Sequence, residues 1–320
     1  MRVGLDCLVA AGLAGHVAGS RAFHAARGER RGPASLEELR EARAQQVPAA
    51  PTAGVTVEQV ADASGRAVPV RIASPATRQL RGVYLDVPGG GFTLGSAAGG
   101  DARDAALAES LGIAVVGVEH RLAPEDPWPA APDDCEAAAL WLLDHAGVRL
   151  GTTALAIGGS SAGATLAVTT LLRLRDRGLA DRVCGAVLQF GTHDLSGRTP
   201  TGRRIAGEYF LEAHVGHVAD RTAPDVSPVF GDLHGLPPTL LVVGALDILL
   251  EDNLVMAARP SAAGNEVDLR VYPESPHGFT GHPTGMARAA LGDRDAWLTE
   301  RLAAARVAGG TALRPAAGTS

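Results

Sequence analysis

Two kinds of segment, which differ in length and in their pattern of apolar and polar residues, alternate along most of this chain. From residue 55 onward, short β-rich apolar runs are separated by longer alanine-rich stretches of mixed polarity. This alternation is typical of βαβ units around a mostly parallel sheet. The short runs predict strands at residues 67–73, 82–87, 113–119, 154–158, 184–190, 239–244 and 267–272. The longer stretches predict helices on both faces of that sheet, at residues 101–111, 130–145, 162–177, 251–263 and 285–305.

Two segments fall outside this alternation. Residues 1–54 precede the first predicted strand and include a charged, helix-favouring stretch, in which Ser35 is placed to cap a helix and Glu38 follows three residues later. Residues 196–228 interrupt the alternation with Arg, Gly and His. We expect both segments to form a cap, residues 55–308 to form one α/β domain, and residues 309–320 to form a flexible tail.

The N-terminal apolar stretch resembles the core of a signal peptide at first sight. Its uncharged part, residues 7–20, is too short to span a bilayer as a helix, which takes about 20 residues. Asp6 and His16 also argue against an export signal. We therefore expect an N-terminal packing helix, no membrane span and a cytoplasmic protein, with export as the alternative.

Composition narrows the chemistry further. The 320 residues are 46% apolar, which suits one large domain with a substantial core. A net charge of −6, without long charged runs, argues against nucleic acid or an anionic membrane as partner. All 29 basic residues are arginine, which excludes a lysine Schiff base and a P-loop. Cys7, Cys135 and Cys184 are too scattered for a disulfide scaffold or a zinc site, so we expect no metal.

The strongest local motif is Gly-Ser-Ser-Ala-Gly at residues 159–163, between a predicted strand and a predicted helix. In a nucleophile elbow the turn is so tight that small residues must flank the central serine, whose hydroxyl then projects above the sheet. Ser161 is therefore the candidate nucleophile. The alternative is a glycine-rich turn that binds nothing.

A serine hydroxyl needs a base to take its proton and an acid to orient that base. Asp247 follows the predicted strand at 239–244, and His277 lies between the last predicted strand and the last helix. Both positions fall at the carboxyl edge of the sheet, in the order serine, acid, histidine. Asp247 is the candidate acid and His277 the candidate base, although His277 taken alone also fits an ordinary surface histidine.

A glycine-rich segment follows the strand at 82–87. Three glycines after Pro88 let the bare backbone approach a ligand closely, and N–H groups from this loop and from Ala162 would stabilise an oxyanion. A flexible loop or a phosphate cradle are the alternatives. The motifs that normally accompany a phosphate cradle are absent from the sequence.

Several blocks together resemble the hormone-sensitive-lipase branch of the α/β-hydrolases. Residues 88–92 are similar to its His-Gly-Gly-Gly-Phe loop, residues 121–125 to its Arg-Leu-Ala-Pro-Glu stretch, and the elbow, Gly-Ala-Leu-Asp and His-Gly-Phe blocks follow in order. The resemblance covers about residues 55–302 and implies an α/β-hydrolase fold with a helical cap. It also implies the triad and the oxyanion donors: Ser161, Asp247 and His277, with Gly90, Gly91 and Ala162.

This sequence departs from the family pattern at four positions. Pro88 replaces the histidine of the glycine loop, which removes a backbone donor and a side chain that helps to fix the loop. Ser160 replaces an aspartate, Ala164 a glycine and His120 a tyrosine. None of these changes removes a member of the triad, so they favour altered efficiency or altered substrate over loss of activity.

The leading hypothesis is a serine carboxylester hydrolase that forms an acyl-enzyme and needs no cofactor. The resemblance implies short-acyl esters as substrates. An acyltransferase or a hydrolase of one dedicated metabolite would keep the triad and alter the oxyanion loop, which Pro88 favours. A ligand-binding homologue without turnover is the third hypothesis, and the sequence leaves a homodimer open.

Overall fold

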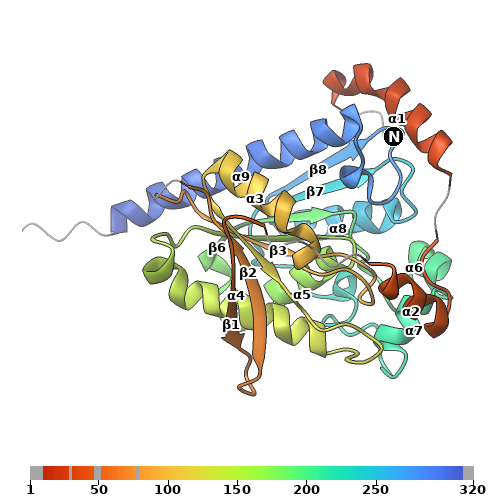
Figure 1. Cartoon of the computed structure of the whole chain (residues 1–320), viewed down its shortest axis with the longest axis horizontal. Coiled ribbons are helices and arrows are strands. Elements are labelled where there is room, and N and C mark those ends of the chain that lie inside the picture. The colour runs from red at the N-terminus through yellow and green to blue at the C-terminus, as the bar shows by residue number, and fades with distance from the viewer. Residues whose placement is uncertain (1–9, 29–30, 47–51, 77–78, 313–320) are drawn as a thin grey trace, which may run out of the picture.

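An eight-stranded sheet forms the centre of the molecule (Figure 1). The computed structural model describes residues 10–28, 31–46, 52–76 and 79–312. The spatial strand order is β1-β2-β4-β3-β5-β6-β7-β8. The strands are β1 Val55–Ala61, β2 Ala67–Ala73, β3 Val83–Val87, β4 Ala114–Val118, β5 Leu155–Ser160, β6 Val183–Gln189, β7 Thr239–Gly244 and β8 Val267–Tyr272.

Six adjacent strands of the sheet, β4, β3, β5, β6, β7 and β8, are parallel to one another. The pairs from β4 through β3, β5, β6 and β7 to β8 are parallel, whereas β1 pairs with β2, and β2 with β4, in antiparallel fashion. The predicted strands are confirmed within two residues at each end. The sequence reading missed β1, an edge strand with polar Glu58 and Gln59 at its centre and mostly exposed side chains.

Helices cover both faces of the sheet, as the alternation predicted. Helices α4, α5 and α8 pack on one face, and α3 and α9 pack on the other. Their bounds are α3 Asp101–Leu111, α4 Ala130–Arg149, α5 Ala162–Asp176, α8 Leu250–Ala262 and α9 Gly285–Ala312. Short 3-10 helices join them: η2 Ala11–Leu13, η3 Ala98–Gly100, η4 Ala180–Arg182, η5 Pro228–Phe230 and η6 Phe279–Gly281.

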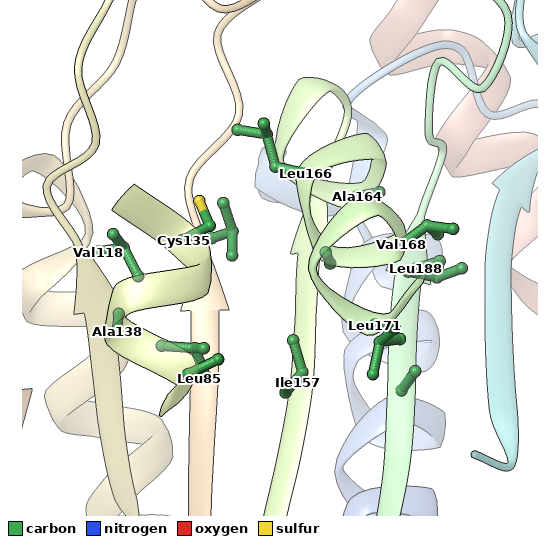
Figure 2. Packing of buried hydrophobic residues seen from close by; sticks show 14 of the residues in the cluster. Leu85, Val118, Cys135, Ala138, Ile157, Ala164, Leu166, Val168, Leu171 and Leu188 are labelled. Atoms are coloured by element: carbon green, nitrogen blue, oxygen red, sulfur yellow. The ribbon is translucent and has the colours of Figure 1, made fainter. Parts of the chain in front are cut away.

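The larger apolar core lies between the sheet and helices α4 and α5. Figure 2 shows α5 laid against β5 and β6, with Ala164, Val168 and Leu171 of the helix close to Ile157 and Leu188 of the strands. Small residues on the helix faces let α4 and α5 approach the sheet closely. This packing fixes the end of β5 and the start of α5, where the proposed nucleophile lies.

The N-terminal segment forms two separate helices, α1 Ala14–Arg27 and α2 Leu36–Ala44. The Ser35 hydroxyl accepts from the Glu38 amide at 3.2 Å, as its position predicted. Helix α1 packs against α9, and its Ser20 hydroxyl donates to the backbone oxygen of Glu274. The segment 196–228 contains two further short helices, α6 Pro200–Ile205 and α7 Tyr209–Val215.

The C-terminal prediction was partly wrong. Helix α9 continues through Ala312, whereas the sequence reading began a tail at Gly309. Gly309 and Gly310 lower helix propensity by only about 1 kcal/mol each, which does not end a long helix that is already formed. Residues 313–320 of the predicted tail, and Cys7, lie outside the described residues.

Candidate active site

Ser161 lies on a strained turn between β5 and α5. Its φ of 53° and ψ of −123° are rare for a residue with a side chain, as expected of a nucleophile elbow. The flanking glycines are required by space. A methyl group on Gly159 would lie 2.5 Å from the Gly163 carbonyl, and one on Gly163 would lie 2.7 Å from the Pro88 oxygen. The turn therefore holds Ser161 by packing against the strand and the glycine loop.

Ser161, His277 and Asp247, which follow three different strands, are joined by hydrogen bonds in one line. The Ser161 hydroxyl lies 2.9 Å from Nε2 of His277. Nδ1 of His277 lies 3.1 Å from both carboxylate oxygens of Asp247. Because a carboxylate only accepts hydrogen bonds, Nδ1 carries the proton and Nε2 is free to accept from the serine hydroxyl.

Asp247 and His277 are held differently by their surroundings. The Asp247 side chain has no exposed surface and accepts a second hydrogen bond, from the Leu249 amide at 2.8 Å. The His277 side chain is 36% exposed and meets Phe190 edge-on, with ring centroids 5.1 Å apart. A buried acid and a base open to the cavity match the roles of orienting group and proton carrier.

The glycine loop folds back on itself beside Ser161. The Leu94 amide donates to the Gly90 oxygen at 2.8 Å, and Gly90 has a φ of 133°, which only glycine adopts readily. A methyl group on Gly91 would crowd the Phe210 side chain. The amides of Gly90, Gly91 and Ala162 donate to no acceptor among the described residues, so they are available to a ligand.

Aromatic residues and His120 support this loop where the family histidine is replaced. Phe92 is buried and stacks on His214 of α7, with ring centroids 4.1 Å apart and planes within 3°. Nδ1 of His120 donates to the Arg121 oxygen at 2.9 Å, and its Nε2 lies 3.4 Å from the Pro88 oxygen. The loop is thus packed between the sheet and α7 although Pro88 has no polar side chain.

Arg43 ties α2 to the same region. Its guanidinium donates to the backbone oxygens of Thr93 at 3.0 Å and Ala123 at 2.7 Å. It also forms a two-pronged ion pair with Glu125 at 2.8 and 2.9 Å. One arginine therefore links the N-terminal segment to the glycine loop and to the segment after β4.

A cavity of about 760 Å³ opens over Ser161 and His277. Its walls come from the glycine loop, the residues after His277, the N-terminal segment and the start of α7. No sequence motif marks several of its side chains, among them Gln46, Arg103, Phe190 and Glu208. The same is true of Phe210, which faces the glycine loop.

The adjacent carboxylates Asp133 and Asp134 and the thiol of Cys184 lie outside the hydrogen-bonded line of Ser161, His277 and Asp247. Asp134 is fully buried and binds the Arg121 amide at 2.8 Å and its guanidinium, and Asp133 pairs with Arg173. Burial raises the pKa of the Cys184 thiol to about 11.

Within the described residues, no three His, Cys, Asp or Glu side chains are arranged to hold a metal ion. None of the described helices is long and apolar enough to cross a membrane.

Comparisons with known proteins agree with this fold. A family model described as the alpha/beta hydrolase fold matches residues 84–281. An acetyl-hydrolase from Streptomyces hygroscopicus is 36% identical over 211 residues, which are 62% of this chain and 69% of that protein. An esterase from the archaeon Pyrobaculum calidifontis superposes with a TM-score of 0.73 and 28% identity, covering 78% of this chain and 86% of that one. A hormone-sensitive lipase from a metagenome library superposes with a TM-score of 0.68 and 28% identity, covering 89% of this chain and 97% of that one. The chain therefore belongs to the α/β-hydrolase family, in its hormone-sensitive-lipase-like branch.

Proposed function

We propose that this protein is a serine carboxylester hydrolase in which Ser161 is the nucleophile, His277 the general base and acid, and Asp247 the orienting acid. The observation that carries the proposal is the hydrogen-bonded line from Asp247 through His277 to the Ser161 hydroxyl, at the floor of an open cavity. Each member lies within the 2.6–3.2 Å reach that proton transfer requires.

The first half of the reaction forms an acyl-enzyme. Ser161 Oγ attacks the ester carbonyl carbon while Nε2 of His277 takes the hydroxyl proton. The imidazolium that results is stabilised by the buried Asp247 carboxylate. His277 then gives the proton to the leaving alcohol oxygen as the carbon–oxygen bond breaks, which leaves the acyl group on Ser161.

Charge develops on the carbonyl oxygen during this attack. The amides of Gly90, Gly91 and Ala162, which have no acceptor among the described residues, are the donors we assign to it. Pro88 stands two residues before Gly90 and offers no N–H. The contacts of Phe92 and His120 support the loop in its place.

Water then completes the cycle. His277 takes a proton from a water molecule that attacks the acyl carbon, and Ser161 leaves with that proton to restore the free enzyme. Every step uses this chain's own residues and water. The proteins named above carry hydrolase, esterase or lipase names, which supports water over another alcohol as the acyl acceptor.

Short-acyl esters are the substrates we propose. One relative carries the name acetyl-hydrolase. The cavity wall also includes the polar side chains of Gln46, Arg103 and Glu208. A long alkyl chain buried against them would displace the water bound to these groups and offer no hydrogen bond in its place. We further propose that α2, α6 and α7 form the cap of this cavity. A homodimer and a cytoplasmic location stay predictions.

Initial rates with nitrophenyl acetate, butyrate and decanoate test this function. We expect kcat/KM for butyrate to exceed that for decanoate at least about tenfold, because the longer chain would desolvate the polar side chains of the cavity wall. The Ser161→Ala variant should be inactive on all three esters. Folded enzyme without turnover of any of them would refute the proposal.

A further inference from the structure

A second, smaller cavity of about 320 Å³ lies beside the catalytic one. Its lining residues belong to the sheet face that α3 and α9 cover, and Figure 1 shows these two helices on the same side of the sheet. Arg103, Ser160, Thr280 and Gly281 border both cavities. Ser160 immediately precedes the nucleophile in the chain. We call this second cavity the side chamber; it is bounded further by the polar side chains of Tyr84, Asp86, Asp104, Gln189 and Arg294 and by the apolar Leu107 and Leu291.

Tyr84 gives the side chamber an unused polar group. Its side chain is 1% exposed, and its hydroxyl has no hydrogen-bond partner among the described residues. Strand alternation explains its direction, since Val83 and Leu85 pack toward α4 and α5 while Tyr84 packs toward α3 and α9. A buried hydroxyl without a partner is costly, and a ligand that bonds to it removes this cost.

The ionised groups around the side chamber largely compensate one another. Arg103 donates to Asp86 at 2.6 Å and to Asp104 at 3.0 Å. Arg294 is 6% exposed and pairs with Asp295 at 2.7 Å. Burial and the nearby Asp86 raise the pKa of Asp104 to about 7, which reduces the negative charge further near neutral pH. Asp86 Oδ1 and Asp104 Oδ2 have no hydrogen-bond partner among the described residues.

The polar part of this lining disfavours three classes of ligand. An alkyl chain would desolvate Asp86, Asp104 and both guanidinium groups without replacing their water. A strong anion would meet the two carboxylates, and a strong cation would meet Arg103 at the entrance and Arg294 inside. A neutral group that both donates and accepts hydrogen bonds fits this lining. The carboxylate oxygens accept hydrogen bonds, and the Tyr84 hydroxyl and the Gln189 side-chain amide can each donate and accept.

We propose that the side chamber binds a neutral, hydroxyl-bearing part of the ester substrate. This inference rests on the proposed esterase function and deepens it. The hydroxyl group can belong to the acyl chain or to the alcohol, because the shared border at Ser160 and Arg103 lies next to the nucleophile and both halves of an ester meet there. In either case the ligand's hydroxyl bonds to Tyr84 and to a free carboxylate oxygen.

Two pairs of esters test the two sources of the hydroxyl group. Ethyl butyrate and ethyl 3-hydroxybutyrate differ only on the acyl side, and propyl butyrate and glyceryl 1-monobutyrate differ only on the alcohol side. Hydrolysis is followed by titration of the released acid at pH 7.5. In at least one pair we expect kcat/KM to be higher for the hydroxylated ester.

The decisive variant is Tyr84→Phe, which removes one hydroxyl group and keeps the ring. In the responding pair, the ratio of kcat/KM for the hydroxylated ester to that for the plain ester should fall about fivefold, the size of one lost neutral hydrogen bond. Tyr272→Phe is the matched control: it removes another buried tyrosine hydroxyl, one bonded to Asp293 and outside the side chamber. Its ratio should stay within twofold of the wild-type value.

A second variant guards against a Tyr84→Phe protein that does not fold. Leu291→Phe, on α9, places a larger side chain in the wall of the side chamber. It should lower the same ratio because the phenyl ring takes up space that the hydroxylated part of the substrate would occupy. Equal kcat/KM within both ester pairs, or a ratio that neither variant moves, would overturn the inference and leave a chamber that holds only water. Turnover of the plain esters separates that result from a failure of the esterase proposal itself.

Discussion

Replacing Asp247 by asparagine removes one charge from the proposed triad and almost nothing else. Asparagine has the same shape, and its oxygen can still accept from the Leu249 amide. It cannot stabilise the imidazolium of His277 as a carboxylate does. Its NH₂ group would also turn the imidazole toward the tautomer that presents N–H, instead of a lone pair, to Ser161.

The size of the effect follows from the distance. Unit charges 3.1 Å apart, in a site with an effective dielectric constant of about 20, attract by about 5 kcal/mol. Because this attraction exists only once His277 is protonated, it lowers the barrier and not the energy of the free enzyme. At about 1.4 kcal/mol per decade, we expect kcat/KM to fall about 10⁴-fold.

The assay compares kcat/KM for nitrophenyl butyrate at pH 7.5, with the melting temperature as a check of folding. Asp252→Asn is the matched control, because Asp252 is also buried but bonds to the His193 and Asp194 amides and not to His277. Its activity should stay within a few-fold of wild type. A loss below tenfold in folded Asp247→Asn enzyme would refute the reasoning.

Three further predictions concern the elbow, the N-terminal segment and pH. Gly163→Ala should lower kcat/KM at least about 100-fold in steady-state assays and lower the melting temperature, because its methyl would collide with the Val87 oxygen and lie 2.7 Å from the Pro88 oxygen. Gly292→Ala, on α9, whose methyl meets nothing within 4 Å, should leave kcat/KM unchanged and should not lower the melting temperature. Arg43→Gln should raise KM several-fold and speed proteolysis of the N-terminal segment, since three anchoring contacts are lost or weakened; unchanged values for both would contradict its anchoring role. Burial raises the pKa of Asp252 from 3.8 to about 7, so the folded state holds this proton more tightly and the group's contribution to stability falls between pH 4 and 7. Asp252→Asn should therefore gain unfolding free energy relative to wild type from pH 5 to pH 8 in urea titrations, and a pH-independent difference would count against this.

The sequence predicted the strands well because their signals are local. Runs such as residues 239–244 are apolar, short and bounded by turn residues, and the structure reproduces that strand with the same bounds. Strand β1 lacked such a signal, since its position at the sheet edge leaves polar residues acceptable along it. The end of α9 was misjudged because two glycines count for less in a long helix than in a short one.

The line of Ser161, His277 and Asp247 was predictable for a topological reason. Each residue follows a strand of one parallel sheet, and the carboxyl ends of such strands meet at a single edge. The side chamber was not predictable in this way. Tyr84 comes from β3, Arg103 from α3 and Arg294 from α9, and only the packing of these helices on the sheet brings them together.

The central claim is that Ser161 is an activated nucleophile. The mass of the intact protein after exposure to a fluorophosphonate tests it most directly, with Ser161→Ala treated alongside and nitrophenyl butyrate hydrolysis followed in parallel. The account predicts a single added phosphonyl group on the wild-type chain, localised to Ser161 by peptide mapping, with loss of turnover in proportion to labelling and no label on the variant. Folded wild-type protein that takes up no label, or takes it up equally in the Ser161→Ala variant, would contradict the account.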